Sequence, residues 1–426
     1  MLFSSKFKGI DIHELFKLKS NFSAESIAFF LLCANLVFMT RAFALVNLIE
    51  FFLLCLFSLN RELRQRLFFV CKYNWAVRGL VLFLLWIALS SIWSISSYSE
   101  SLIDLWSWRK LMLFPMAIVL VNSPERFSIM IQSLIAISLI FCIASWLGYF
   151  GMIELDRQPQ HLLENHTTQG ILFSVSALGI LTLQKRGIFG NANVLKLVAW
   201  SLVVVLVLNN LVISTGRGGY VMLVTVLGIF PFMYGTRPVK TFFLSIIVAF
   251  TALALLFSFS TPRAKIFQAF TELNTAYESD RHTSLGIRLI MAKTTIQMIE
   301  DSPLLGSGSG GFVHQYAELI RSSNLSGWRA MVSDDPHNQY LHVIAEYGLI
   351  GFFFLAFVLF QIAKTIPQNY IPSYSVFVSA IFVGTLLNCI FNGHISAFVE
   401  GRLFWIFTGA FVGIYASSHL TEKIYN

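Results

Sequence analysis

The sequence predicts an all-α integral membrane protein with about 12 transmembrane helices and one long polar segment. Apolar residues make up 56% of the 426-residue chain and charged residues only 12%, which is unlike a soluble globular protein. Runs of about 20 mostly apolar residues, the length that crosses a bilayer as a helix, recur along the chain. Residues 260–338 contain no such run and are too many for a passive connection.

The predicted spans follow one another closely on both sides of the polar segment. They lie at 24–41, 43–59, 78–95, 108–123, 127–150, 168–184, 195–214, 219–235, 241–259, 339–363, 372–392 and 400–418. The last run begins with Glu400 and Arg402, which are unusual residues at the start of a span. We therefore divide the chain into residues 1–259 with nine helices, a loop domain at 260–338, and residues 339–426 with three helices.

Basic residues define the expected orientation. Lys and Arg gather in alternate short turns, at 61–78, 126, 185–196, 237–240 and 364. Such turns are typically cytoplasmic, so we expect both termini inside and residues 260–338 on the periplasmic side. The net charge of +8 is explained by these turns, and we expect no nucleic-acid partner. We also expect no cleavable signal peptide.

The polar segment is predicted to be partly helical. Apolar residues recur at helical spacing from Ser284 to Met298, and Asp301-Ser302-Pro303 should end that helix. GSGSGG at 306–311 is expected to be flexible or to turn tightly. It is not a phosphate-binding loop, because no Gly-Lys-Ser/Thr follows it. Residues 312–322 can form a second helix.

Arg217 is the first candidate for chemistry, within the sequence STGRGGY. Glycines at 216, 218 and 219 remove side-chain bulk around the cation, which would let an anion approach the guanidinium and the start of the next helix. The alternative is an interfacial arginine that reaches lipid headgroups from a glycine-rich turn. Spacing alone leaves both interpretations open.

Arg288 and His337 are the other two candidates. Arg288 lies in the apolar run SLGIRLIM, so it either faces a cleft or the membrane surface, or is a solvated charge. His337 follows Pro336 at the start of a span, where an imidazole held neutral by the helix N-terminus could accept a proton from a hydroxyl. The alternative is a polar residue bonded to its own turn.

No metal site is expected. Asp334 and Asp335 are adjacent carboxylates without further ligands, which is more typical of a solvated helix cap than of a divalent-ion site. The five cysteines have neither metal-ligand spacing nor the pattern of a disulfide framework.

Together these segments resemble the superfamily of O-antigen ligases and polymerases, which are bacterial inner-membrane glycosyltransferases. The resemblance covers roughly residues 165–400, and its strongest motif is DDPHNQYLHVIAEYGLIGFF at 334–353. It implies a GT-C-like helical fold and transfer of a glycan from undecaprenyl diphosphate to an acceptor hydroxyl, without cofactor or obligatory metal. Arg217 and Arg288 would hold the diphosphate, and His337 would orient or deprotonate the acceptor. We expect its neighbours Asn338 and Asp335 to help orient the acceptor.

Within the superfamily we expect an O-antigen ligase, with lipid A–core as acceptor and membrane lipids as surroundings. The Pro-His-Asn sequence and the single dominant loop favour it over an O-antigen polymerase. A protein O-oligosaccharyltransferase is usually longer. A transporter or flippase for lipid-linked sugars is the alternative from another class, and Glu50 and Asn392 are its candidate intramembrane polar sites. It should also show internal repeats, and none is evident.

Overall fold

The computed structural model describes residues 23–154, 163, 165–190, 192–275, 284–323, 325–368 and 371–425. Every regular element in these residues is a helix. Among the residues described, six helices are long and apolar enough to cross a membrane, and a seventh span is obtained if one bent helix pair is counted as one. The chain is therefore an all-helical, multi-pass membrane protein, whereas the count of about 12 spans stays a prediction.

The helices run in the following order. They are α2 (Ala24–Phe38), α3 (Phe43–Leu59), α4 (Arg61–Tyr73), α5 (Trp75–Ser90), α6 (Tyr98–Ser107), η1 (Trp108–Met112), α7 (Leu113–Leu120), α8 (Pro124–Tyr149), α9 (His166–Lys185), α10 (Asn193–Val212), α11 (Arg217–Ile229), η2 (Phe230–Met233), α12 (Pro238–Ser258), α13 (Ser260–Thr275), α14 (Ser284–Asp301), α15 (Phe312–Ser322), η3 (Gly327–Ala330), α16 (Gln339–Thr365), η4 (Ile366–Gln368), α17 (Pro372–Asn388) and α18 (Phe398–Tyr425). Helices α3 and α4 form the bent pair.

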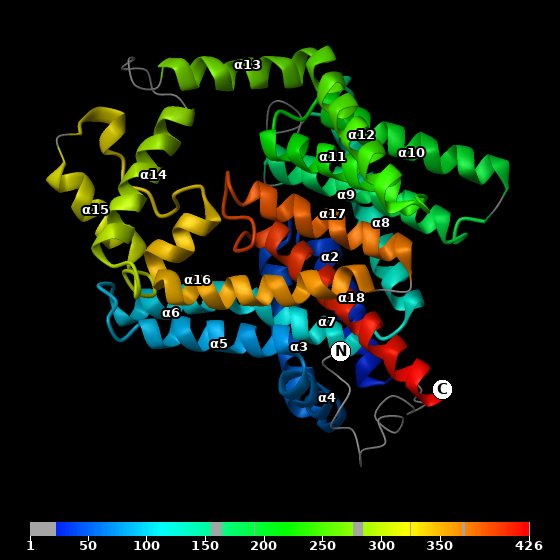
Figure 1. Cartoon of the computed structure of the whole chain (residues 1–426), viewed down its shortest axis with the longest axis horizontal. Helices are drawn as coiled ribbons and strands as arrows, with labels where there is room; N and C mark the ends of the chain where they lie inside the picture. Colours follow the sequence, from blue (N-terminus) through cyan, green and yellow to red (C-terminus); the bar gives the residue numbers. More distant parts are fainter. Residues whose placement is uncertain are drawn as a thin grey trace.

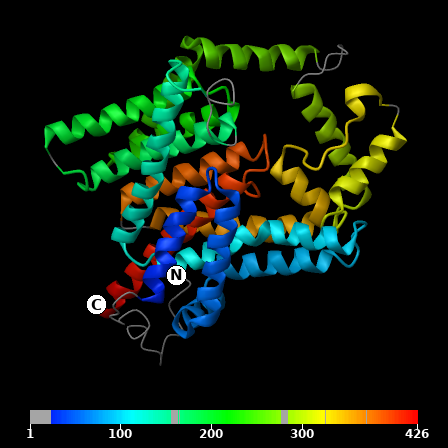
Figure 2. The same cartoon turned by 180° about the vertical axis from the view of Figure 1, so that it is seen from behind.

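Helices α9 and α18 form the interior of the bundle, and 89% of the apolar window of each is buried. Helix α18 packs on α7 and α11 packs on α9 (Figures 1 and 2). The close approach of α18 to α7 requires small residues, because a Cβ at Gly409 would lie 2.4 Å from the carbonyl oxygen of Phe114. At the periphery, only 22% of the window of α12 is buried, as expected for a lipid-facing helix.

The charges at the start of α18 are paired inside the bundle. Arg402 is fully buried, and its guanidinium donates to both oxygens of Glu50 over 2.6 and 3.0 Å. Glu400 accepts a hydrogen bond of 2.5 Å from the hydroxyl of Thr168. Because these charges have partners, α18 can be a central helix despite its polar beginning.

The segment predicted as a span at 108–123 consists of two helices that follow one another directly. The 3₁₀ helix η1 leads into α7, which has only eight residues. Two cations lie in the 3₁₀ part: Arg109 pairs with Glu50 over 3.2 Å, and Lys110 bonds to the carbonyl of Ser396. The change of helix type interrupts the regular α-helix within this segment, and its crossing of the membrane stays a prediction.

Helix α16 is also broken, at Gly348, which has a φ of 71°. The break frees backbone groups on both of its sides, and residues 303–308 bond to them. Ser307 N–H and Gly308 N–H each donate over 2.9 Å, to the carbonyls of Ala345 and Glu346, while Leu349 N–H donates to Pro303 over 2.9 Å. The freed groups are thus satisfied by another segment, as a broken helix at membrane depth requires.

The described residues of the polar segment form three α-helices and the short 3₁₀ helix η3. The two predicted helices are confirmed, since α14 covers 284–301 and α15 covers 312–322. Met291, Met298, Phe312, Tyr316 and Ile320 form a small core between them. Helix α13, which the sequence pattern did not predict, leads from α12 toward α14 along one edge of the molecule (Figure 1).

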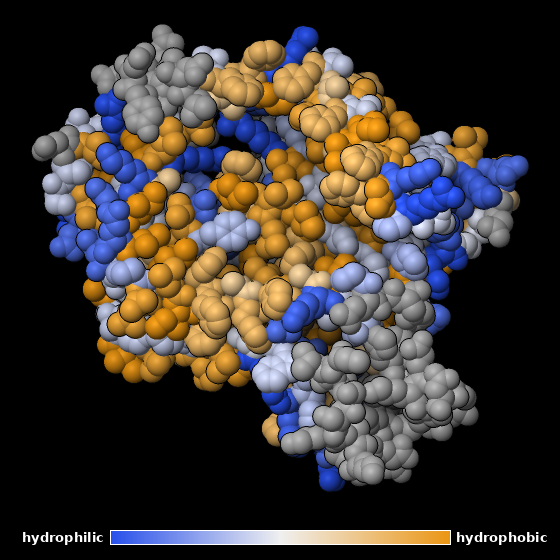
Figure 3. Space-filling model, viewed as in Figure 1, coloured by the Kyte–Doolittle hydropathy of each residue, from blue (hydrophilic) through white to orange (hydrophobic). Residues whose placement is uncertain are grey.

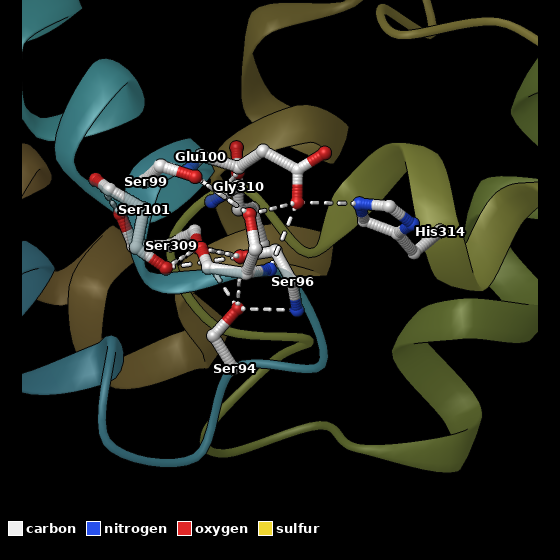
Figure 4. A network of polar contacts seen from close by, with 10 residues as sticks. Ser94, Ser96, Ser99, Glu100, Ser101, Ser309, Gly310 and His314 are labelled. Atoms are coloured by element: carbon white, nitrogen blue, oxygen red, sulfur yellow. Dashed lines mark hydrogen bonds and ion pairs between the residues drawn. The ribbon is translucent and has the colours of Figure 1, made fainter.

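GSGSGG at 306–311 is a fixed turn rather than a flexible one. Three of its glycines have positive φ, at 306, 308 and 310. The carbonyl of Ser309 accepts from the hydroxyls of Ser94, Ser96 and Ser101 over 2.8, 2.9 and 2.8 Å (Figure 4). A Cβ at Gly308 would lie 2.5 Å from the Cα of Ser94. The turn therefore anchors α14 and α15 to the loop between α5 and α6.

Candidate functional site

The sequence candidates come from three separate elements that meet on the α14–α15 side of the bundle. Arg217 begins α11, Arg288 lies in the second turn of α14, and His337 lies two residues before α16. The charges of Arg217, Asp335 and Glu272 all act on the guanidinium of Arg288. His337 joins the same group, because its backbone N–H donates to Asp335 over 2.7 Å.

Arg217 is held by a rigid turn. The hydroxyl of Ser214 donates to the carbonyl of His166 over 3.0 Å, and the hydroxyl of Tyr220 donates back to the carbonyl of Ser214 over 2.5 Å. Gly216 is the N-cap of α11 and provides no side-chain cap. The side chain of Arg217 is 30% exposed, so the start of α11 presents a cation that solvent can reach.

The glycines beside Arg217 have a different role from the predicted one. A Cβ at Gly216 would lie 2.4 Å from the backbone of Thr167, and one at Gly219 would lie 2.8 Å from the Cα of Gly170. A Cβ at Gly218 would lie 2.6 Å from the Oδ1 of Asn388. These glycines let α11 pack tightly against α9 and α17, so the interpretation that they clear space for an anion was wrong.

Arg288 is partly buried, and its apolar neighbours explain why. Ile287 and Met291 belong to the small core that α14 shares with α15. Burial lowers the pKa of Arg288, and the positive charge of Arg217 lowers it further, while Asp335 and Glu272 act in the opposite direction. The charges of two cations and two carboxylates therefore act on one another around Arg288.

Glu272 is the residue beside Arg217 that the sequence pattern did not reveal. Its Oε2 lies 3.5 Å from Nη2 of Arg217 and accepts a 3.2 Å hydrogen bond from the backbone N–H of Leu285. Its other oxygen accepts from the amide of Gln268 over 2.8 Å. Glu272 therefore connects α13, the start of α14 and the start of α11. The sequence around Glu272 does not indicate its contact with Arg217, because a single carboxylate in a helix of mixed polarity is usually an ordinary surface residue.

His337 has a constrained backbone. Its φ of 53° is the one positive value at a non-glycine position among the described residues. Non-glycine residues in this region cost of order 1 kcal/mol or more and cluster at functional sites. The ring is oriented by Asn392, whose Oδ1 lies 3.1 Å from Nδ1.

Asn338 and Asp335 take part in the local structure around His337. The Asn338 side chain caps α16 by accepting from the backbone N–H groups of Tyr340 and Leu341 over 3.0 and 3.1 Å. Asp335 holds the backbone of His337. Their expected contact with an acceptor stays a prediction.

A second histidine lies behind the site, in the loop from α17 to α18. His394 is 2% exposed, and its Nδ1 lies 3.9 Å from Glu400. Burial lowers the pKa of His394, against the opposing charges of Glu400 and Asp335. The sequence gives no sign of this residue, because one histidine in a short loop is usually an ordinary polar residue.

The surface around the site is hollowed. Figure 3 shows hydrophilic residues inside a depression between the α14 region and the remaining bundle, with apolar residues around it. Exposed aromatic side chains lie on the nearby helix α13, where Phe267 and Phe270 are 58% and 59% exposed. Within the described ranges, no group of three or more His, Cys, Asp or Glu residues could hold a metal ion.

Comparison with known proteins finds a family that matches one region of the chain. Residues 202–356 match the family model described as O-antigen ligase, and the match includes Arg217, Arg288 and His337. The resemblance to the O-antigen ligase and polymerase superfamily is thereby confirmed. An uncharacterized protein of Haemophilus influenzae is 26% identical over 161 residues. That alignment covers 37% of this chain and 40% of the relative, so the chain matches less than half of the relative's length.

Proposed function

We propose, from the O-antigen ligase match of residues 202–356, that the protein is an O-antigen ligase of the bacterial inner membrane. It would transfer a polysaccharide from undecaprenyl diphosphate to a sugar hydroxyl of lipid A–core on the periplasmic face. The fold would be GT-C-like with cytoplasmic termini, and α13, α14 and α15 would form the periplasmic domain. The pair of cations, Arg217 and Arg288, is the observation that carries this proposal.

The arginines would bind the diphosphate of the donor. Negative charge grows on this leaving group as the bond to the anomeric carbon breaks, and two guanidiniums stabilise it through charge-assisted hydrogen bonds. The lipid tail would leave the site sideways, past the exposed apolar residues of α13.

His337 would accept the proton of the acceptor hydroxyl as its oxygen attacks the anomeric carbon. The new C–O bond forms while the bond to the diphosphate breaks, so a single displacement inverts the anomeric centre. This reaction needs neither a metal nor a nucleotide sugar, and addition of a chelator should leave the rate unchanged.

Acceptor specificity tests the proposal. The purified protein in lipid nanodiscs is supplied with an undecaprenyl-diphosphate-linked glycan and, separately, with lipid A–core or a second lipid-linked repeat. Transfer to lipid A–core supports the ligase. Extension of the lipid-linked repeat alone would identify a polymerase, and movement of the donor lipid without transfer would identify a transporter.

A further inference from the structure

We propose that Asn392 is a positioning residue that fixes the tautomer of His337, so that Nε2 is the nitrogen that accepts the proton. The effect of Asn392 on catalysis rests on the proposed function. The hydrogen bond itself can be tested by a measurement that does not depend on glycan transfer. Asn392 lies in the loop between α17 and α18, outside the family match.

The argument begins with the chemistry of the contact. Nδ1 of His337 lies 3.1 Å from Oδ1 of Asn392. An amide oxygen has lone pairs and no hydrogen, so Nδ1 must carry the proton of this bond. A neutral imidazole has only one N–H, and Nε2 is then left with its lone pair. Within the described part of the chain, no group is found hydrogen-bonded to Nε2 of His337.

The loop that carries Asn392 is attached firmly to the segment that carries His337. Gln339 N–H donates to the carbonyl of Cys389 over 2.9 Å. The Oε1 of Gln339 in turn accepts from the backbone and hydroxyl of Ser396 over 3.0 and 2.9 Å. Asn392 thus lies between two points at which its loop is hydrogen-bonded to the segment of His337.

The choice of a neutral partner has a chemical consequence. An aspartate at this position would also orient the ring, but its charge would stabilise the imidazolium and keep the ring protonated up to a higher pH. The site already contains the carboxylate of Asp335 and the cation of Arg288. An amide orients the imidazole without adding to these charges.

Asn392→Leu and Asn392→Asp form a matched pair of variants. Leucine preserves the approximate size and removes the acceptor oxygen, whereas aspartate keeps that oxygen. We expect Asn392→Leu to lower kcat roughly tenfold to a hundredfold, with the KM for the donor nearly unchanged. Asn392→Asp should recover most of this loss, with the acidic limb of its rate profile moved to higher pH. Ile390→Ala, an exposed residue of the same turn, is the control.

A double-mutant cycle separates positioning from folding. In a His337→Gln background, Asn392→Leu should cause no further loss of rate. An equal loss in both backgrounds would show that Asn392 only supports the structure, and the proposal would be overturned.

Nitrogen NMR provides the readout that is independent of transfer. In the full-length protein with ¹⁵N-labelled histidine, the His337 signals are identified by subtraction of the His337→Gln spectrum. We expect a protonated Nδ1 and an unprotonated Nε2 above neutral pH, and a changed tautomer ratio in Asn392→Leu. An unprotonated Nδ1 in the wild type would overturn the inference. Failure of the wild type to transfer glycan would instead count against the proposed function alone.

Discussion

The carboxylate of Glu272 lies 3.5 Å from the guanidinium of Arg217, in the place where an anion beside this cation is expected. A diphosphate would therefore compete with Glu272 for Arg217. We expect Glu272→Gln to bind undecaprenyl diphosphate more tightly, by roughly fivefold, since partly exposed ion pairs are worth up to about 1 kcal/mol. Glutamine can still accept from the backbone N–H of Leu285, so α14 should remain in place. Product inhibition in the transfer assay measures this affinity, and weaker inhibition would contradict the competition.

The two arginines should be individually required. Arg217→Ala and Arg288→Ala should each lower kcat/KM by about a hundredfold, because each removes one donor to the leaving group. Arg→Lys at either position should be only a partial rescue, since an ammonium group lacks the bidentate geometry. Arg321→Ala, an exposed arginine on α15, is the matched control. Normal transfer by either alanine variant would refute the proposed diphosphate site.

His337→Gln should reduce turnover and leave donor binding intact. Glutamine cannot accept the hydroxyl proton as a base, but the arginines that bind the donor are unchanged. Single-turnover transfer and donor-lipid binding are measured on the same preparation. Parallel loss of both would make His337 a binding residue.

Asp104 of α6 should make stability depend on pH. Burial, followed by the charge of Glu346, raises the pKa of Asp104 to about 7. In the unfolded chain the pKa of this carboxyl has its ordinary value of about 3.9, so the unfolded chain holds the proton less tightly. Between about pH 4 and pH 7 the folded state therefore binds more protons, and stability falls as the pH rises.

Asp104→Asn should make the melting temperature less dependent on pH across this range. Asparagine can still accept from Ser309 and Tyr347, which both donate to Asp104 over 2.7 Å. Asp334→Asn, at an exposed carboxylate, should leave the pH dependence as it is. Identical slopes in the wild type and Asp104→Asn would disprove the assignment.

The buried pair of Glu50 and Arg402 should be structural. Glu50→Gln leaves a buried guanidinium without its counter-ion and should cost about 3 kcal/mol of stability. Replacing both residues, by Glu50→Gln with Arg402→Met, should cost less than the single change. Thermal unfolding in detergent compares the variants, and a double variant less stable than Glu50→Gln would contradict this view. Retained transfer by the double variant would argue against a transport role for Glu50.

The sequence predicted the elements whose signals are local. Residues 312–322 form the expected helix, and the helix from Ser284 continues only three residues beyond the predicted Met298. Hydropathy could not locate the break at Gly348, because the residues after it are as apolar as a continuous span. Gly348 itself and the nearby Glu346 were the two features of this run that could indicate a break, but both residues also occur in unbroken helices.

The site shows the same division. Motifs led to the prediction of Arg217, Arg288 and His337, whereas Glu272 and Asn392 reach two of them only through contacts between segments far apart in the chain. The glycines around Arg217 were interpreted as open space, although the structure places helix backbones against them. A single sequence specifies that small residues are present, but not which neighbour requires them.

The joining of residues 303–308 to the broken helix α16 has a mechanical consequence. The segment follows α14 directly, so it ties the helix that carries Arg288 to the helix that follows His337. Arg217 lies on α11, which packs on α9 and α17, and Glu272 joins its guanidinium to the start of α14 through Leu285. A doubly charged ligand held by both arginines would therefore join α14 to α11 directly, in place of the contact through Glu272.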